Sequence, residues 1–115
     1  MNKYDVIIIG SGPVGLSLAK SLSNKSFSVC VIDRQTKDEL SNPAYDGREV
    51  AITHFSKNIL KDIGSWDLID RSCISHLKEA KVINGNSPYS LHFNFEETNQ
   101  TTLGYLIPNH RIKSA

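Results

Sequence analysis

A glycine-rich turn near the start of the chain constrains the fold more than any other feature. The segment YDVIIIGSGPVG carries an apolar run into the motif G-x-G-x-x-G. Gly10 permits a tight turn out of a strand, Gly12 lets backbone amides approach a pyrophosphate, and Gly15 lets a helix pack closely on the sheet. The motif therefore predicts a βαβ unit that binds a dinucleotide.

An acidic residue at the end of the next apolar run supports this interpretation. Asp33 closes the segment VCVID, where an acid in such a unit accepts hydrogen bonds from a ribose. The N-terminus of the intervening helix adds unpaired amides and a partial positive charge that suit phosphates. The alternative is a glycine-rich turn in an ordinary βαβ unit that binds no ligand.

Hydrophobic periodicity predicts the order β-α-β, loop, helices and further strands. We expect strands at 4–9, 28–33, 49–53, 80–83, 89–95 and 103–107, and helices at 13–24, 56–63 and 109–115. The continuous apolar character of the first strand predicts a buried parallel strand, and the alternation in 89–95 predicts one buried face. Segment 34–47 is polar and aperiodic, which predicts a loop.

The pattern after the second strand narrows the fold class. A two-domain dehydrogenase would continue with alternating parallel units, whereas here the later strands are separated by turns typical of antiparallel pairing. We therefore expect an α/β fold, with a Rossmann-like βαβ unit followed by additional strands, as in flavoprotein-type dinucleotide domains that carry an inserted sheet.

Composition excludes several classes of function. The sequence is 39% hydrophobic and 22% charged with a net charge of +1, so no electrostatic argument favours nucleic acid as a partner. The longest apolar run falls far short of the roughly 20 residues of a membrane span. Two cysteines and four histidines show no metal-ligand spacing, so we expect no metal and a cytoplasmic location. No side-chain pairing indicates a catalytic acid, base or nucleophile.

Several segments together resemble one enzyme family. They are YDVIIIGSGPVGLSLAKSL, VIDRQ, DGREVAIT, ILKDIGSWDLI and LGYLIPNHRI, in this order. The chain is similar to FAD-dependent aromatic-ring monooxygenases, and within them to the ubiquinone-biosynthesis hydroxylases. DGREVAIT followed by IGSWDLI is much narrower than the glycine motif and carries the assignment to the subgroup.

The resemblance implies a p-hydroxybenzoate-hydroxylase-like flavoprotein fold that binds FAD. Enzymes of this family take electrons from NADPH or NADH and insert one atom of O2 into a phenol ring. In the ubiquinone subgroup the substrate is a polyprenylated phenol. The resemblance therefore implies a peripheral position at the inner membrane, or association with a ubiquinone-biosynthesis complex, without a transmembrane segment.

The resemblance also assigns the adenosine and pyrophosphate contacts. The glycine loop, with Pro13 at the first helical position, would face the pyrophosphate, and Asp33 would bind the adenosine ribose. The family usually has glutamate at that position, and aspartate keeps the same acceptor pair. Arg34 would lie on the adenosine side, with a solvated charge at a strand end as the alternative.

Two further residues are assigned to the flavin half of the cofactor. Arg48, in DGREVAIT, resembles an arginine that reaches the phosphate and ribityl region, where a guanidinium can pair bidentately with phosphate oxygens. The alternative is a surface ion pair with Asp46 or Glu49. Asn109 matches a polar position on the flavin side, with Arg111 as the alternative, and Asn109 could also be the N-cap of the last helix.

Length sets a further expectation. The family is much longer than this sequence, so residues 1–115 are expected to be the N-terminal part of an FAD-binding domain, with the remaining FAD and substrate regions absent. We expect a chain of this length to bind FAD weakly or not at all and to be inactive. We also expect it to expose apolar surface.

Overall fold

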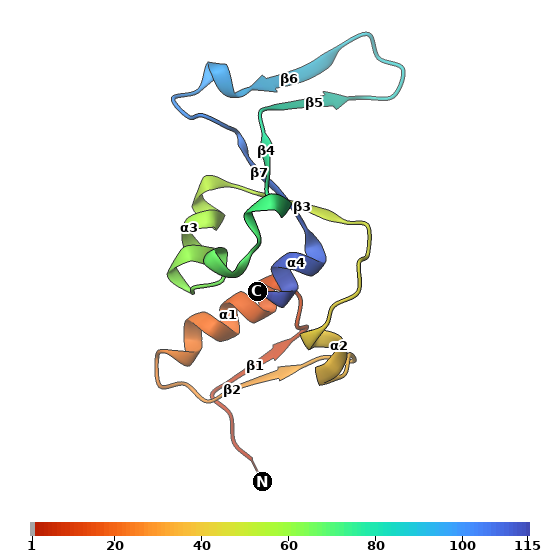
Figure 1. The fold of residues 1–115 in the computed structure, drawn as a ribbon. Helices are drawn as coiled ribbons and strands as arrows, with labels where there is room; N and C mark the ends of the chain where they lie inside the picture. The colour runs from red at the N-terminus through yellow and green to blue at the C-terminus, as the bar shows by residue number, and fades with distance from the viewer. Residues whose placement is uncertain (1) are drawn as a thin grey trace.

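The computed structural model describes residues 2–115 and contains helices and strands arranged in three small sheets (Figure 1). In chain order the elements are β1 (Val6–Ile9), α1 (Pro13–Ser23), β2 (Val29–Ile32), α2 (Lys37–Ser41), β3 (Glu49–Ile52), α3 (His54–Asp62), the 3-10 turns η1 (Trp66–Leu68) and η2 (Arg71–Cys73), β4 (Ser75–Leu77), β5 (Glu79–Ile83), β6 (Ser90–Asn94), the 3-10 turn η3 (Phe95–Glu97), β7 (Gly104–Pro108) and α4 (Asn109–Ser114).

The predicted βαβ unit is confirmed. β1 and β2 pair in parallel, with Val6 opposite Val29, and α1 connects them. The expected burial of β1 is wrong, because only Ile8 is buried, whereas Ile7 and Ile9 are 58% and 87% exposed. Side chains alternate across a strand, and Ile8 lies on the face covered by α1. Within residues 2–115 the other face of this two-stranded sheet has no covering layer.

A three-stranded antiparallel sheet forms the centre of the molecule. β7 lies between β3 and β4, with Ile52 opposite Tyr105 and Leu77 opposite Gly104. Because β7 leads directly into α4, the pairing of β7 with β3 brings the last helix next to the segment that precedes β3. β4 is too short to produce a periodic signal, and the sequence did not indicate it.

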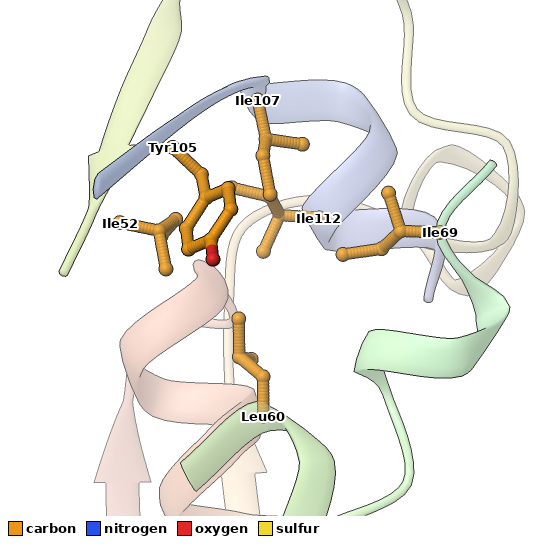
Figure 2. Close-up of a cluster of buried hydrophobic side chains, with 6 residues drawn as sticks. All are labelled: Ile52, Leu60, Ile69, Tyr105, Ile107 and Ile112. Carbon is orange, nitrogen blue, oxygen red and sulfur yellow. The ribbon is translucent and has the colours of Figure 1, made fainter. Parts of the chain in front are cut away.

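The hydrophobic core lies against this central sheet. Its six side chains come from β3, β7, α3, α4 and the turn after η1, and Figure 2 shows them gathered together; they are Ile52, Leu60, Ile69, Tyr105, Ile107 and Ile112. The α3 helix presents Leu60 to this cluster. Its N-cap is Thr53, whose hydroxyl accepts a hydrogen bond from the Ser56 amide. Burial of this cluster fixes α3, α4 and the sheet as one unit.

The β5–β6 hairpin projects away from the rest of the molecule (Figure 1). The predicted alternation in 89–95 is confirmed by strand β6, but the expected buried face is wrong, because Tyr89, Leu91 and Phe93 are all exposed. The radius of gyration is 17.4 Å, whereas a compact domain of this size would have about 13 Å. The hairpin thus makes the molecule elongated and leaves its apolar side chains uncovered within residues 2–115.

The sequence predicted a loop at 34–47, but this segment contains a short helix. The helix is α2, which begins with a capping box: the Thr36 hydroxyl accepts from the Glu39 amide, and the Glu39 carboxylate accepts from the Thr36 amide.

The longest helix of the described residues, α1, has 11 residues. Among residues 2–115 no helix combines the length and apolar character that a membrane crossing requires.

Candidate cofactor-binding site

The glycine loop joins β1 to α1, and its glycines have different structural roles. Gly10 has a φ of +102°, a conformation that favours glycine. A Cβ on Gly15 would lie only 2.1 Å from the Gly10 carbonyl oxygen, so Gly15 is required for the close approach of helix and turn. A Cβ on Gly12 would meet no heavy atom within 4 Å. The space beside Gly12 is therefore open in this structure.

The N-terminus of α1 has no capping side chain. Gly12 is the N-cap residue, and Pro13 follows as the first helical residue, where its missing N–H costs nothing. By contrast, the N-caps of α2 and α3 are threonines whose hydroxyls accept backbone hydrogen bonds. The amides of the first turn of α1 have no intrahelical partners. These free amides, together with the partial positive charge at the N-terminus of a helix, attract an anion such as a phosphate.

The Asp33 carboxylate lies against the glycine loop. Its Oδ2 accepts hydrogen bonds from the Ser11 amide and hydroxyl, both at 2.7 Å, and its Oδ1 accepts from the Gln35 amide at 2.9 Å. These bonds, with the Ser11 amide first, hold the pKa of Asp33 well below its usual range. A carboxylate has about four lone-pair sites, so one acceptor position on Oδ1 remains for a ligand hydroxyl.

Sequence reasoning missed Ser11, which lies between the first two glycines and is fully buried. Its two hydrogen bonds to Asp33 connect the end of β2 to the turn after β1. The only available signal was its position inside the motif, where the residue type is not restricted. Arg34, by contrast, is exposed directly after β2. Its assignment to the adenosine side remains a prediction.

A second cluster of polar side chains forms where the segment before β3 meets the start of α4. Asp46 Oδ2 accepts hydrogen bonds from Arg48 Nε at 2.9 Å, Arg48 Nη2 at 2.6 Å and Asn109 Nδ2 at 2.7 Å. The Asn109 bond, followed by the Arg48 bonds, holds the pKa of Asp46 well below its usual range. The Arg48 side chain remains 72% exposed. The ion pair with Asp46, the alternative interpretation of Arg48, is therefore present.

The alternative interpretation of Asn109, as the N-cap of the last helix, is wrong. Pro108 is the N-cap of α4, and Asn109 is the first helical residue, with its side chain directed to Asp46. The Asn109 amide also donates to the Arg48 carbonyl at 2.9 Å. Sequence reasoning considered Asp46 only as one possible partner of Arg48. Its contact with Asn109 spans 63 residues, and no local pattern could indicate it.

The two clusters lie on connected elements. Helix α4, which begins at Asn109, is packed against α1, the helix that follows the glycine loop. A hollow of about 310 Å³ lies between α1, β3 and α3, lined in part by Pro13, Val14, Val50 and Ala51. The hollow extends from the first turn of α1 to β3, the strand that follows Arg48. Its volume is near the lower end of the range for ligand pockets.

A family model described as an FAD binding domain matches residues 3–113, which is nearly the whole chain. The chain belongs to this FAD-binding family. FAD is therefore the dinucleotide that the βαβ unit was predicted to bind, and the predicted α/β flavoprotein fold is confirmed.

Curated relatives confirm the resemblance to the ubiquinone hydroxylases. The chain is 44% identical over 115 residues to ubiquinone hydroxylase UbiM of Neisseria meningitidis, an alignment that covers 96% of this chain and 25% of the relative. It is 37% identical over 111 residues to ubiquinone hydroxylase UbiL of Rhodospirillum rubrum, with the same two coverages. The chain thus spans about a quarter of the length of the curated relatives it matches.

Solved structures share the fold at low sequence identity. PqsL of P. aeruginosa superposes with a TM-score of 0.67 at 18% identity, covering 97% of this chain and 29% of that protein. The myxobacterial chondrochloren halogenase CndH superposes with a TM-score of 0.65 at 20% identity, covering 96% of this chain and 24% of that protein. These similarities concern the fold alone.

The residues present fit the pyrophosphate and adenosine parts of FAD. The uncapped first turn of α1 and the open space at Gly12 leave room and donors for phosphate oxygens. Asp33 retains one acceptor position for a ribose hydroxyl. Arg48 uses only part of its guanidinium in the ion pair with Asp46.

Proposed function

We propose that the chain is the N-terminal part of the FAD-binding domain of an NAD(P)H-using monooxygenase that hydroxylates a polyprenylated phenol in ubiquinone biosynthesis. The observation that carries the proposal is the 44% identity to a ubiquinone hydroxylase across nearly the whole chain. The DGREVAIT segment and the glycine loop both fall within this alignment. The geometry of the glycine loop is compatible with the proposal, because it leaves an uncapped helix N-terminus and an open approach at Gly12.

The proposal gives the sequence-predicted residues of the two clusters roles toward FAD. Gly10, Gly12, Pro13 and Gly15 would shape the pyrophosphate cradle. Asp33 would accept from the adenosine ribose, with Arg34 on the same side. FAD, when bound, supplies the redox chemistry, and the protein supplies binding and orientation.

The flavin half would be held by the second cluster. Arg48 would pair with a phosphate oxygen, because the glycine loop provides only neutral N–H donors to a doubly charged group. Asn109 would lie on the flavin side of the cofactor. No residue of this chain is assigned a catalytic role. The substrate, O2 and the nicotinamide reductant would be bound by residues outside the chain.

The test uses the full-length protein that carries this sequence. Reading the coding sequence past Ala115 comes first, because an open frame of the relatives' length is expected and a stop codon would favour a remnant without enzymatic activity. The purified protein should contain flavin and oxidise NADPH or NADH in the presence of a polyprenylated phenol, with consumption of O2. The product should carry one additional oxygen atom, which mass spectrometry can detect.

A reductase of the same fold is the second candidate. The chain is 28% identical over 91 residues to a digeranylgeranylglycerophospholipid reductase of Haloferax volcanii. A reductase would add hydrogen to a polyprenyl chain without consuming O2. Reduction of the substrate under anaerobic conditions would therefore favour this second candidate over the hydroxylase.

The membrane association is also part of the proposal. A polyprenylated substrate partitions into the bilayer, so the full-length protein is proposed to bind the inner-membrane surface or to join a ubiquinone-biosynthesis complex. Flotation with lipid vesicles and co-purification with other biosynthesis proteins test the two forms of association. Recovery of the protein free of both would contradict this part of the proposal.

A further inference from the structure

We propose that Asp46 is a positioning residue, which holds the Arg48 guanidinium in the orientation that receives the FAD pyrophosphate. This inference rests on the proposed function. Asp46 is not among the residues assigned to FAD above. Simple electrostatics would even count against it, because a carboxylate close to a phosphate repels it.

The hydrogen bonds that Asp46 makes within residues 2–115 all come from Arg48 and Asn109. Its Oδ2 already accepts three N–H groups, two from Arg48 and one from Asn109. Its Oδ1 accepts the Arg48 backbone amide at 3.1 Å. With three donors on Oδ2 and one on Oδ1, the carboxylate is engaged mainly by the protein itself, and of its about four lone-pair sites only one, on Oδ1, stays unused. Because its negative charge would repel a phosphate, we place the role of Asp46 in its contacts with Arg48 and Asn109.

The ion pair uses one edge of the guanidinium and leaves another edge available. Arg48 donates to Asp46 from Nε and Nη2. The group carries five N–H donors in a rigid plane, so both hydrogens of Nη1 and one of Nη2 remain. The edge formed by Nη1 and Nη2 can make two parallel hydrogen bonds to a phosphate. The Arg48 side chain as a whole is 72% exposed, and among the described residues no hydrogen bond is made by Nη1.

Asn109 connects this ion pair to helix α4 through two hydrogen bonds. The Asn109 side chain is bonded to Asp46, and its backbone amide is bonded to the Arg48 carbonyl at 2.9 Å. Asn109 itself is buried, and α4 is packed against α1. Asp46 therefore connects the orientation of Arg48 to the helix whose N-terminus would face the same pyrophosphate. Fixing a long side chain before binding lowers the entropic cost of binding.

The direction in which Asp46→Asn changes the affinity for FAD separates a positioning role from simple electrostatics. Asp46→Asn removes a negative charge beside the proposed phosphate, so electrostatics alone predicts tighter FAD binding. Positioning predicts weaker binding, by about tenfold, because the charge-assisted bonds that orient Arg48 are lost. The matched control is Glu49→Gln, which removes a charge from an exposed residue of β3 that makes no side-chain hydrogen bond among the described residues.

The measurement is a flavin fluorescence titration of the full-length apoprotein, with thermal unfolding recorded for each variant. In an Arg48→Ala background, Asp46→Asn should have no further effect on FAD affinity, because its influence passes through Arg48. A purely structural role would weaken binding equally in both backgrounds. Such a result, or Asp46→Asn binding as tightly as the parent protein, would overturn the inference.

A second variant covers the case in which Asp46→Asn does not fold. Arg48→Lys keeps the charge, but an ammonium group has no planar edges with which to hydrogen-bond Asp46 and a phosphate at the same time. We therefore expect it to lose FAD affinity to about the same extent as Asp46→Asn. If Arg48→Lys binds FAD like the parent, the inference is wrong. If the parent protein itself binds no FAD, the proposed function fails, and this outcome is distinct from a failure of Asp46 alone.

Discussion

Single residues of the glycine loop perform separable tasks. Gly15 is needed for packing, since a Cβ there would lie 2.1 Å from the Gly10 carbonyl oxygen, whereas Gly12 borders open space. The backbone of Gly12, with φ −70° and ψ 175°, is also accessible to alanine. The same substitution at these two positions can therefore separate the stability of the fold from the binding of FAD.

We expect Gly15→Ala to destabilise the protein and Gly12→Ala to weaken FAD binding. Alanine normally stabilises a helix relative to glycine, but the clash at position 15 should cost roughly 1–3 kcal/mol or more. Gly12→Ala should change stability by less than about 1 kcal/mol. Urea unfolding of the apoprotein and FAD titration measure the two effects. Equal stability losses in both variants would contradict the separation.

Asp33 should make stability depend on acid pH. Hydrogen bonds from Ser11 and Gln35 depress its pKa in the folded protein, so its ionised form favours folding. This contribution is fully present above the unfolded-state pKa of about 3.9 and is lost as the pH falls below that value toward the depressed pKa. Asp33→Asn lacks this titration. The difference in urea midpoint between the parent and Asp33→Asn should therefore narrow between pH 7 and pH 3, and a constant difference would refute the assignment.

Residues whose roles depend on local spacing could be predicted from the sequence, whereas residues whose roles depend on distant partners could not. The glycines and Asp33 were found because their roles depend on fixed spacing within one βαβ unit. Ser11 and the contact of Asp46 with Asn109 were missed because both depend on partners across the fold: Ser11 bonds Asp33 after β2, and Asp46 bonds Asn109 on α4. The alternative role of Asn109 as an N-cap was considered for the same reason, since its local position fits a cap and its partner Asp46 lies far away in the sequence.

Among the elements, most of the strands and helices were predicted, whereas α2 and β4 were not. The βαβ unit, α3, β6 and β7 all occur near the expected positions. Helix α2 has five residues, too few to establish an apolar face, and its only sequence signal is the T-x-x-E capping box. Strand β4, with three residues, depends entirely on pairing with β7.

The capping box of α2 gives a prediction at the scale of the element. Thr36→Ala should destabilise α2 locally by about 1 kcal/mol and leave the global unfolding transition nearly unchanged, because no α2 residue is buried. Hydrogen exchange at the Leu40 and Asn42 amides, which bond within this turn, should become faster. Ser41→Ala is the control: it removes the hydroxyl that donates to the Lys37 carbonyl at 2.9 Å but keeps the capping box, and it should leave exchange at Leu40 unaltered.

At the scale of the whole molecule, apolar surface is left uncovered in two places. Ile9 and Val14 are exposed beside the βαβ unit, and Leu91 and Phe93 are exposed on the projecting hairpin. A two-stranded hairpin is marginally stable alone in water. The elongated shape and these surfaces explain why the expected buried faces of β1 and β6 were wrong, although their patterns were correctly identified.

We therefore expect residues 1–115, produced alone, to self-associate through the hairpin. Contiguous apolar surface and unpaired strand edges both favour association. Leu91→Lys with Phe93→Lys places two charges on the apolar face and should shift the chain toward monomer in light-scattering chromatography. Ser90→Lys with His92→Lys adds the same charges to the opposite face, because strand side chains alternate, and should leave association in place. If both pairs act alike, the strand edges rather than the apolar face drive association, and a monomeric parent chain would show that neither surface does.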